Sequence, residues 1–391
     1  MPLQSYMKLI SVDDHVIEHP SVWETRLPPA MRDRGPRVVE VKEEFRGRWG
    51  ETFAPGSQLW VYEDRPNPQL ALNAVAGKPY EERNLEPRRY DELMPGCYDP
   101  VARVRDMDLD GVHAQLCFPN VPRFAGTLFL QSDDLQLAQV CVEAYNDFIL
   151  DEWCAAAPGR LIPLIILPLW DVDLAANEVR RCAAKGAKAI SFPENTVPLG
   201  LPSFWTDHWD TLFDVVEDTD LALCMHFGTS GSVPTTSPEA PEIVQISLMG
   251  TNSMFAVVDI LFSPLLHNHP ALRIMLSEGG IGWMPYLLER MDSSWERNRS
   301  YMPINQEVRP SELFGRHIWG CFIDDPSGIR ARDQIGIDRI LWEGDYPHSD
   351  SNFPHSRKIL GEALADVPDE DAHRMVELNA RNVLRLAPDP S

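Results

Sequence analysis

The chain has 391 residues, of which 59 are acidic and 35 are Lys or Arg, so its formal net charge is −24. A surface this acidic repels phosphate backbones and anionic lipids, and we therefore expect no nucleic-acid binding and no binding to a membrane surface. Hydrophobic residues make up 44% of the chain and charged residues 24%, which excludes a mostly disordered protein. No uninterrupted apolar run reaches the ~18 residues of a membrane span, so none is predicted.

The N-terminal segment and the cysteines indicate the compartment. Residues 1–9 lack the cationic and apolar regions of a secretory leader, so no signal peptide is predicted. The seven cysteines are scattered, form no CxxC pair and lie mostly in apolar segments, as buried free thiols do. This usage predicts a reducing, cytoplasmic environment.

Eight apolar segments of strand length recur along the chain, and most are separated by stretches with helical periodicity. The strand segments are 8–16, 114–120, 160–170, 187–194, 221–228, 273–280, 317–325 and 339–347. Their near-continuous hydrophobicity is typical of strands buried on both faces. The alternation predicts an α/β protein with a (β/α)8 TIM barrel. A doubly wound sheet is the alternative, but no GxGxxG motif follows the first strand.

Six segments carry the apolar spacing of amphipathic helices. They are 133–155, 174–185, 204–217, 254–266, 283–298 and 371–386. Asp133 or Ser132 is the expected N-cap of the first helix, and Gly186 is the expected stop of the second. The apolar face of 254–266 could form a dimer contact.

Residues 32–100 are a long irregular insertion between the first and second strands, rich in Pro, Gly, Trp and charge. In a barrel, the segment after strand 1 lies at the C-terminal face, where active sites form. We therefore interpret residues 1–391 as one barrel domain. Within it, 32–100 is either a lid or subunit-contact segment, or a plain surface covering.

Polar residues stand at the carboxyl ends of four of these apolar strands. The candidate metal ligands are Asp13, His15, Glu18, His226, Glu278 and Asp345, and His348 follows three residues after the last. Because side chains alternate along a strand, Asp13 and His15 share one face. Burial of an unpaired carboxylate costs roughly several kcal/mol of free energy, and a single cation shared by these residues would offset this cost.

Each of these residues also has a simpler interpretation when it is taken alone. His226 could be a hydrogen-bonded core residue, Asp345 a turn cap and Glu278 a loop residue. Their joint placement at strand ends favours a metal site. A mixed set of histidines and carboxylates suits Zn, Mn or Fe. Two histidines with four carboxylates are also the ligand inventory of di-iron proteins, so one ion or two is expected.

The ordered motifs along the chain resemble those of the amidohydrolase-related family of metal-dependent barrels, which includes aminocarboxymuconate-semialdehyde decarboxylase and γ-resorcylate decarboxylase. The matching segments are ISVDDHVIEHP, YDPVARVRDMDLDGVHAQLCFPN, AYNDF, CMHFG, LSEGGIGWMPYLLERMD, LWEGDYPHSDSNFP and ELNARNVLRL, and they extend from residue 10 to residue 386. The resemblance implies a divalent metal at the C-terminal mouth of the barrel.

The same resemblance implies roles for particular residues. The His-x-His or Glu-x-His motif of strand 1 matches Asp13 and His15, and the ligand of strand 5 matches His226. The aspartate of strand 8 matches Asp345. Decarboxylase members of the family have a catalytic histidine at the end of strand 6, where this chain has Glu278.

Our main functional hypothesis is metal-assisted hydrolysis or non-oxidative decarboxylation of a small organic acid, aromatic or acyl substrate. Asp345 and Glu278 are the expected catalytic carboxylates, Glu278 as the proton-transfer group, and His348 could orient the substrate. One alternative is a di-iron monooxygenase that hydroxylates an apolar acyl or terpenoid-like substrate. Another is a non-catalytic binding barrel. As in relatives of this family, a homodimer is expected.

Overall fold

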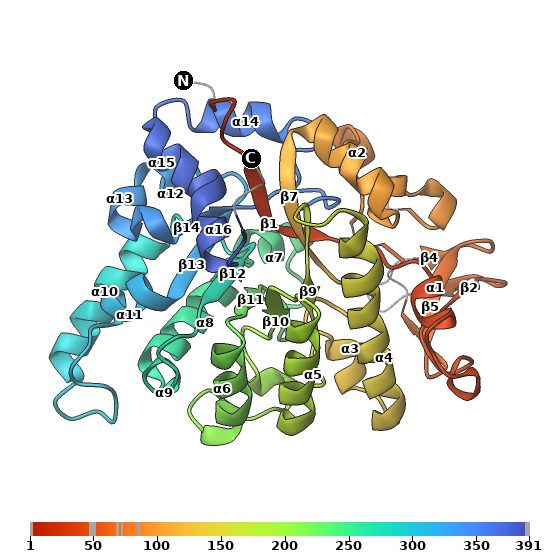
Figure 1. Cartoon of the computed structure of the whole chain (residues 1–391), viewed down its shortest axis with the longest axis horizontal. Coiled ribbons are helices and arrows are strands. Elements are labelled where there is room, and N and C mark those ends of the chain that lie inside the picture. Colours follow the sequence, from red (N-terminus) through yellow and green to blue (C-terminus); the bar gives the residue numbers. More distant parts are fainter. Residues whose placement is uncertain (1–2, 47–51, 68–69, 72, 84–86, 388–391) are drawn as a thin grey trace.

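Eight parallel strand positions form a closed ring at the centre of the molecule (Figure 1). The computed structural model describes residues 3–46, 52–67, 70–71, 73–83 and 87–387. The ring strands are β1 (Leu9–His15), β7 (Val112–Phe118), β8 (Leu161–Ile162), β9 (Leu164–Ile165), β10 (Ala189–Ser191), β11 (Ala222–His226), β12 (Ile274–Ser277), β13 (Ile318–Phe322) and β14 (Ile340–Trp342). The predicted (β/α)8 barrel is confirmed. Most strands are shorter than their apolar segments, whereas β7 has the predicted length but begins two residues earlier.

Two features of the ring depart from simple strand pairing. β8 pairs with β7 and β9 pairs with β10, so these two short strands are halves of one barrel strand. Pro163 separates them, because its nitrogen has no hydrogen to donate to a neighbour. Backbone hydrogen bonds from Asp345 N to Asp13 O (2.8 Å) and from His15 N to Tyr346 O (2.7 Å) close the ring between its first and last strands.

Helices surround the ring (Figure 1). They are α1 (Ser21–Glu24), α2 (Pro100–Asp110), α3 (Thr127–Leu130), α4 (Leu135–Phe148), α5 (Val172–Ala184), α6 (Asp210–Asp218), α7 (Glu242–Leu248), α8 (Thr251–Phe262), α9 (Leu265–Asn268), α10 (Met284–Asn298), α11 (Pro310–His317), α12 (Pro326–Arg330), α13 (Arg332–Ile335), α14 (Ser356–Ala363), α15 (Asp369–His373) and α16 (Asn379–Val383). Short 3-10 and π-helical turns lengthen several of these helices.

All six predicted helices are present, but their ends differ from the prediction. The N-cap of α4 is Asp134, whose side chain accepts hydrogen bonds from the N–H groups of Gln136 and Leu137, and not Asp133 or Ser132. Pro264 lies between α8 and α9 and divides the helix predicted over 254–266. Gly186 follows α5 with a φ of +98°, as expected for a glycine stop. Among the helices of eight residues or more, α2, α11 and α14 were not predicted, and several shorter helices were not predicted either.

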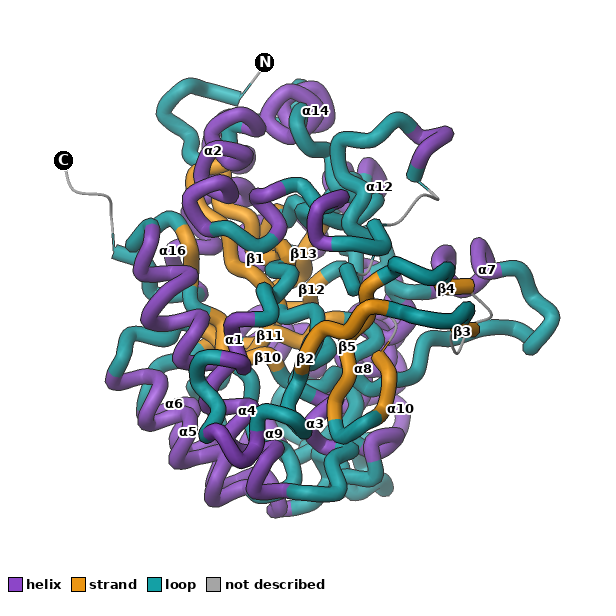
Figure 2. The backbone as a smooth tube through the Cα atoms, turned by 90° about the vertical axis from the view of Figure 1, so that its right-hand side faces the viewer, coloured by secondary structure: helices purple, strands orange, loops and turns teal. Residues whose placement is uncertain are grey.

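The insertion 32–100 contains regular structure that its composition did not reveal. β2 (Arg37–Glu40), β5 (Gln58–Tyr62) and β6 (Arg65–Asn67) form an antiparallel sheet, and β3 (Phe45–Arg46) pairs with β4 (Thr52–Phe53). Figure 2 shows this sheet in front of the ring. The indole of Trp60 is 1% exposed and packs edge-on against Trp23, with ring centroids 5.4 Å apart. The insertion is therefore anchored on the barrel by an apolar contact.

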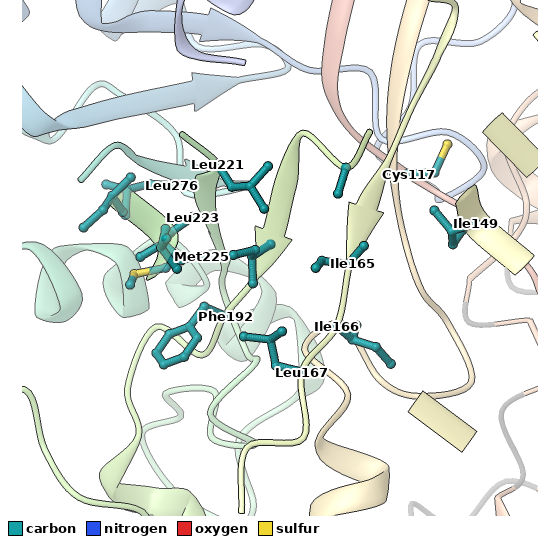
Figure 3. Packing of buried hydrophobic residues seen from close by; sticks show 14 of the residues in the cluster. Cys117, Ile149, Ile165, Ile166, Leu167, Phe192, Leu221, Leu223, Met225 and Leu276 are labelled. Atoms are coloured by element: carbon teal, nitrogen blue, oxygen red, sulfur yellow. The ribbon is translucent and has the colours of Figure 1, made fainter. Parts of the chain in front are cut away.

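Side chains of the ring strands divide into two apolar clusters. One cluster fills the inside of the ring and contains Ala222 and Cys224 of β11. The other lies between the ring and its helices and contains Leu223 and Met225, which Figure 3 shows beside Leu276 of β12. Strict alternation along β11 therefore places its last residue, His226, on the inner side of the ring.

One helical stretch needs separate mention. Residues Glu242–Phe262, which span α7 and α8, are long and apolar enough to cross a membrane by length and composition alone. A criterion based on uninterrupted apolar runs does not detect this stretch. A single candidate of this kind is weak support for a membrane span, because core helices of other proteins meet the same test.

One buried hydroxyl group reinforces the closure of the ring. Ser11 Oγ accepts a hydrogen bond from the N–H of Gly344 (2.8 Å) and donates one to the carbonyl of Asp13 (3.1 Å). Replacement of Ser11 by Ala leaves the buried N–H of Gly344 without its partner. We predict that Ser11→Ala lowers the free energy of unfolding by about 1–3 kcal/mol in a denaturant titration. A loss as small as that of the exposed control Ser300→Ala would contradict this role.

Candidate metal centre

A β-bulge in β1 turns two polar side chains into the ring. Ser11 pairs with Gln115 and Asp14 pairs with Cys117, so β1 has one more residue than β7 between these pairs. Ile10 before the bulge and Val12 within it belong to the inner apolar cluster. The extra residue shifts the alternation, so that Asp13 and His15 follow on the inner side in place of Asp14. Both side chains are completely buried.

His226 is held in a defined orientation at the end of β11. Its Nδ1–H donates a hydrogen bond to the carbonyl of Phe227 (2.7 Å), and this leaves the lone pair of Nε2 available. Nε2 lies 3.6 Å from an oxygen of Asp13 and 3.0 Å from Oε2 of Glu278. The ends of β11 and β12 thus bring the imidazole of His226 and the carboxylate of Glu278 together, next to Asp13 of β1.

Asp345 and Glu278 both occupy strained backbone positions. Each has a φ of +53°, in the left-handed region that side-chain-bearing residues adopt at a cost. They follow β14 and β12, where the chain turns sharply as it leaves the ring. Gly279 permits the second turn, because a Cβ at this position would collide with Ser253. Strain of this kind is concentrated at functional sites, and here it aims two carboxylates at one point.

The distances between ligand atoms of Asp13, His15 and Asp345 match those between ligands of one metal ion. His15 Nε2 lies 3.2 Å from Asp345 Oδ1 and 3.4 Å from Asp13 Oδ1. Metal–ligand bonds of about 2.0–2.2 Å place neighbouring ligand atoms roughly 3.0–3.5 Å apart. Ligand atoms of Asp13, His15 and His226 all lie within 4.8 Å of one another, as do those of His15, Asp345 and His348. These two groups share His15.

Several donor atoms in the group are buried without a hydrogen bond. Both oxygens of Asp13, both ring nitrogens of His15 and Nε2 of His226 have no hydrogen-bond partner among the described residues. A buried polar atom without a partner is costly, and a cation would satisfy the oxygens of Asp13 together with Nε2 of His15 and Nε2 of His226, which lie next to them. The donor set therefore fits a divalent metal ion.

The electrostatics of the group agree with this interpretation. Burial is the main cause that raises the pKa of Asp13 well above its usual value, and the neighbouring carboxylates of Glu343 and Asp345 raise it further. Burial likewise raises the pKa of Asp345. Burial lowers the pKa of His15, so its imidazole is neutral and can act as a ligand. Ionisation of the carboxylates thus requires a positive charge in their midst.

Glu18 is the predicted ligand that the structure does not bring to this group. Its two oxygens accept hydrogen bonds from the N–H groups of Asn120 and Val121, each 2.9 Å long. Burial raises the pKa of Glu18 to about 7. Its carboxylate ties the segment after β1 to the loop after β7, which is a structural role.

Two buried acidic residues beside the group were missed from the sequence. Glu343 is 1% exposed, and its Oε2 accepts a hydrogen bond from the backbone N–H of Glu278 (3.0 Å). Asp14 points away from the ring and accepts hydrogen bonds from Tyr346 N (3.0 Å) and Gln115 Nε2 (3.1 Å). Both residues stand at apolar strand ends, which could have indicated that they are buried. Sequence alone does not distinguish a metal ligand from an acidic residue beside it.

Arg103 of α2 stabilises the backbone beneath the candidate metal ligands, and it was not identified from the sequence. Its guanidinium is completely buried, donates a hydrogen bond to the carbonyl of His15 (2.5 Å) and reaches Gln115 Oε1 (3.2 Å). It also lies over the ring of Tyr346, 4.4 Å from the centroid. Arg103 thereby connects the ends of β1, β7 and β14 and fixes the backbone that carries His15.

The remaining side chains at the centre are aromatic. The ring of Phe124, in the loop after β7, lies 4.7 Å from that of His15 and 4.3 Å from that of His226. His348 Nδ1 is 2.8 Å from Asp345 Oδ1, and its ring lies 3.8 Å from that of His15. An apolar cover of this kind excludes water and strengthens the electrostatic interactions beneath it.

Comparison with known proteins gives two kinds of similarity. The chain is 22% identical over 341 residues to 2-amino-3-carboxymuconate-6-semialdehyde decarboxylase of Caenorhabditis elegans, with 75% of this chain and 81% of the relative covered. It is 25% identical over 301 residues to γ-resorcylate decarboxylase of Polaromonas sp., covering 73% of this chain and 86% of the relative.

Solved structures share the fold over almost the whole chain. An amidohydrolase from Mycobacterium avium subsp. paratuberculosis superposes with a TM-score of 0.74 at 18% identity, covering 97% of this chain and 100% of the other. The manganese complex of 5-carboxyvanillate decarboxylase from Novosphingobium aromaticivorans gives 0.65 at 16% identity, covering 97% of each chain. The sequence model of the amidohydrolase family matches residues 62–386, which is most of the chain. The chain therefore belongs to the amidohydrolase family.

Proposed function

We propose that the protein is a metal-dependent carboxy-lyase that removes CO2, without an oxidant, from a small aromatic or related unsaturated carboxylic acid. The observation that carries this proposal is the convergence of buried donor atoms from Asp13, His15, His226 and Asp345, several without a partner. The named relatives are decarboxylases, which favours decarboxylation over the oxygenase and non-catalytic alternatives.

The four residues would hold one divalent cation, and the manganese in the decarboxylase from Novosphingobium aromaticivorans supports Mn²⁺ as the first choice, ahead of Zn²⁺ or Fe²⁺. When bound, the cation supplies a positive charge that orients the acid and withdraws electron density from it. A single ion is favoured because both potential ligand groups depend on the same imidazole of His15.

Glu278 is the proposed proton donor. Its side chain is 14% exposed and lies 3.0 Å from His226 Nε2, at the boundary between the buried donors and the mouth. Decarboxylation breaks the bond between the substrate carbon and its carboxylate, CO2 leaves, and the electron pair stays on that carbon. Glu278 then gives its proton to the carbon and regains one from water. This carboxyl group replaces the histidine that the resemblance places at the same strand end.

The two residues above the donors position the substrate. Phe124 offers the face of an aromatic ring against which a planar acid stacks, as expected for an aromatic or conjugated substrate. His348 is held by Asp345 and is 4% exposed, so its imidazole can direct a hydrogen bond towards a substrate oxygen.

The proposal extends to the cellular compartment, the oligomeric state and the role of the insertion. All seven cysteines are buried and unbridged, which supports a reducing, cytoplasmic compartment. Ile243 of α7 and Phe255 of α8 are 63% and 66% exposed, and this apolar face supports a homodimer. The insertion 32–100 follows β1 and is proposed to act as a lid or subunit contact at the mouth.

Deuterium incorporation tests the reaction. With a panel of ortho-hydroxylated benzoic acids and Mn²⁺, incubated without air in D2O, we predict release of CO2. The product should carry one deuterium on the carbon that lost the carboxylate, as seen by mass spectrometry and NMR. Turnover that requires O2, or a product containing oxygen from water, would contradict the proposal and favour oxygenation or hydrolysis respectively.

The role of Glu278 is tested by an isosteric change. Glu278→Gln removes the transferable proton, and we predict a loss of turnover of about 10²–10⁴-fold with bound manganese unchanged. Glu289→Gln, an exposed change on α10, is the matched control and should leave turnover unaltered. Loss of the metal together with activity would instead identify Glu278 as a ligand.

The raised carboxyl pKa values predict how metal binding depends on pH. In the metal-free protein the folded pKa values of Asp13 and Asp345 exceed the unfolded values, so stability from these groups is present at low pH. It is lost as the pH rises above about 4 towards the folded pKa values. Metal binding needs both carboxylates ionised.

We therefore predict that the increase in Tm produced by Mn²⁺, relative to protein treated with a chelator, grows from about pH 5 to about pH 8. His226→Asn should abolish most of this increase at every pH. A metal-induced Tm increase that is constant or that falls with rising pH would show that these carboxylates do not bind the ion.

A further inference from the structure

We propose that the chain carries a second divalent-cation site, suited to Zn²⁺, on the face of the barrel opposite the candidate metal centre. Its ligands are Asp214 and Glu217 of α6 and His269, which follows α9. Ligand atoms of these three residues lie within 4.8 Å of one another. No part of this inference depends on the proposed function.

The position in the fold separates this site from the first. α6 ends at Asp218, just before the start of β11, and His269 lies shortly before the start of β12. His226 stands at the other end of β11, at the carboxyl ends of the strands. The second site is therefore at the amino ends of the same strands, on the face that barrel enzymes do not use for catalysis.

His269 is a buried imidazole with one engaged nitrogen and one without a hydrogen bond. The residue is 2% exposed, and its Nε2–H donates a hydrogen bond to Oδ1 of Asp210 (3.1 Å). With the proton on Nε2, the lone pair of Nδ1 faces the carboxylates of Asp214 and Glu217. Nδ1 has no hydrogen-bond partner among the described residues.

The separations at Nδ1 fit a shared cation better than a shared proton. Nδ1 lies 3.4 Å from Asp214 Oδ1 and 3.6 Å from Glu217 Oε2. A charge-assisted N–H···O bond brings the heavy atoms to about 2.7–2.9 Å. Zn²⁺ bonds of about 2.0–2.1 Å in tetrahedral geometry separate two ligand atoms by roughly 3.4 Å. The observed spacing leaves room for an ion between the three atoms.

The charges around Nδ1 also call for a cation. Asp210, Asp214 and Glu217 recur at helical spacing on one face of α6, so their carboxylates repel one another. In the described part of the chain, His269 is the only side chain that comes within ion-pairing distance of these three carboxylates and can carry positive charge. Imidazole nitrogen and carboxylate oxygen both bind Zn²⁺, and a water would complete a four-coordinate site with these three side chains.

The remaining contacts define how an ion would enter and what it would do. Asp214 is 69% exposed, so the site is open to solvent on one side. Glu217 also accepts a hydrogen bond from the N–H of Ala271, and the ring of Phe213 packs edge-on against His269. A bound ion would therefore clamp α6 to the segment between α9 and β12. Asp210 would fix the tautomer of His269 from the other side.

Zinc retention tests the site in the full-length protein. Chelator-treated protein is loaded with Zn²⁺, dialysed against buffer of low free Zn²⁺ and analysed for metal content. We predict that Asp214→Asn and Glu217→Gln each retain one equivalent less than wild type. The control Asp218→Asn, which removes a charge from the same helix, should retain the wild-type amount. Equal retention in wild type, Asp214→Asn and Glu217→Gln would overturn the proposal, whatever is bound at the first site.

The tautomer argument gives a second measurement. Asp210→Ala should weaken zinc binding at this site by about 10–100-fold, because the outer hydrogen bond is lost. In NMR spectra of ¹⁵N-histidine-labelled protein, Zn²⁺ should shift the Nδ1 resonance of His269 in wild type and leave it unchanged in Asp214→Asn. A His269 Nδ1 that carries a proton both before and after addition of Zn²⁺ would also overturn the proposal, since a proton would then occupy the position of the ion.

Discussion

The dominant constraint on this structure is the electrostatic cost of burying several carboxylates close together. Asp13, Glu343 and Asp345 are completely or almost completely buried in the ring. Glu343 and Asp345 raise the pKa of Asp13, and Asp345 raises the pKa of Glu343, in addition to the larger effect of burial. In an apolar interior this arrangement is stable only if the carboxylates are protonated or a cation lies among them. The neutral imidazole of His15, the imidazole of His226 oriented by its hydrogen bond to Phe227, the strained turns and the aromatic cover are all arranged around these carboxylates.

Much of the scaffold serves to bring the donors to one point. The bulge in β1 exchanges Asp14 for Asp13 on the inner face, and Asp14 is then used outside the ring to hold Tyr346. Backbone hydrogen bonds between the same two chain segments close the barrel. Arg103 binds the carbonyl of His15 from beneath. The interactions that close the barrel therefore also position the donor atoms of the site.

The sequence predicted the barrel because strands buried on both faces leave long apolar runs, and eight such runs alternate with helical patterns. It also singled out Asp13, His15, His226, Glu278 and Asp345, because a polar residue at the end of an apolar strand is conspicuous, and these side chains lie together in the structure. The antiparallel sheet within 32–100 was not predicted, because its short strands pack against Trp23 of the barrel and local periodicity does not record such contacts.

Other residues could not have been assigned from sequence for equally physical reasons. Glu18 has the composition and spacing of a ligand, but two backbone N–H groups from a distant loop occupy its oxygens. Phe124 and Arg103 act through contacts between segments far apart in the chain. The cluster around His269 joins a helix face to a loop 50 residues later, and only the folded chain brings them together.

Anomalous diffraction from crystals grown with Mn²⁺ tests the central claim most directly. The predicted result is one strong manganese peak about 2.0–2.3 Å from donor atoms of Asp13, His15, His226 and Asp345, with Glu18 outside its reach. A map with no peak inside the ring, or with the metal bound by other residues, would contradict the claim that these four side chains form a metal centre.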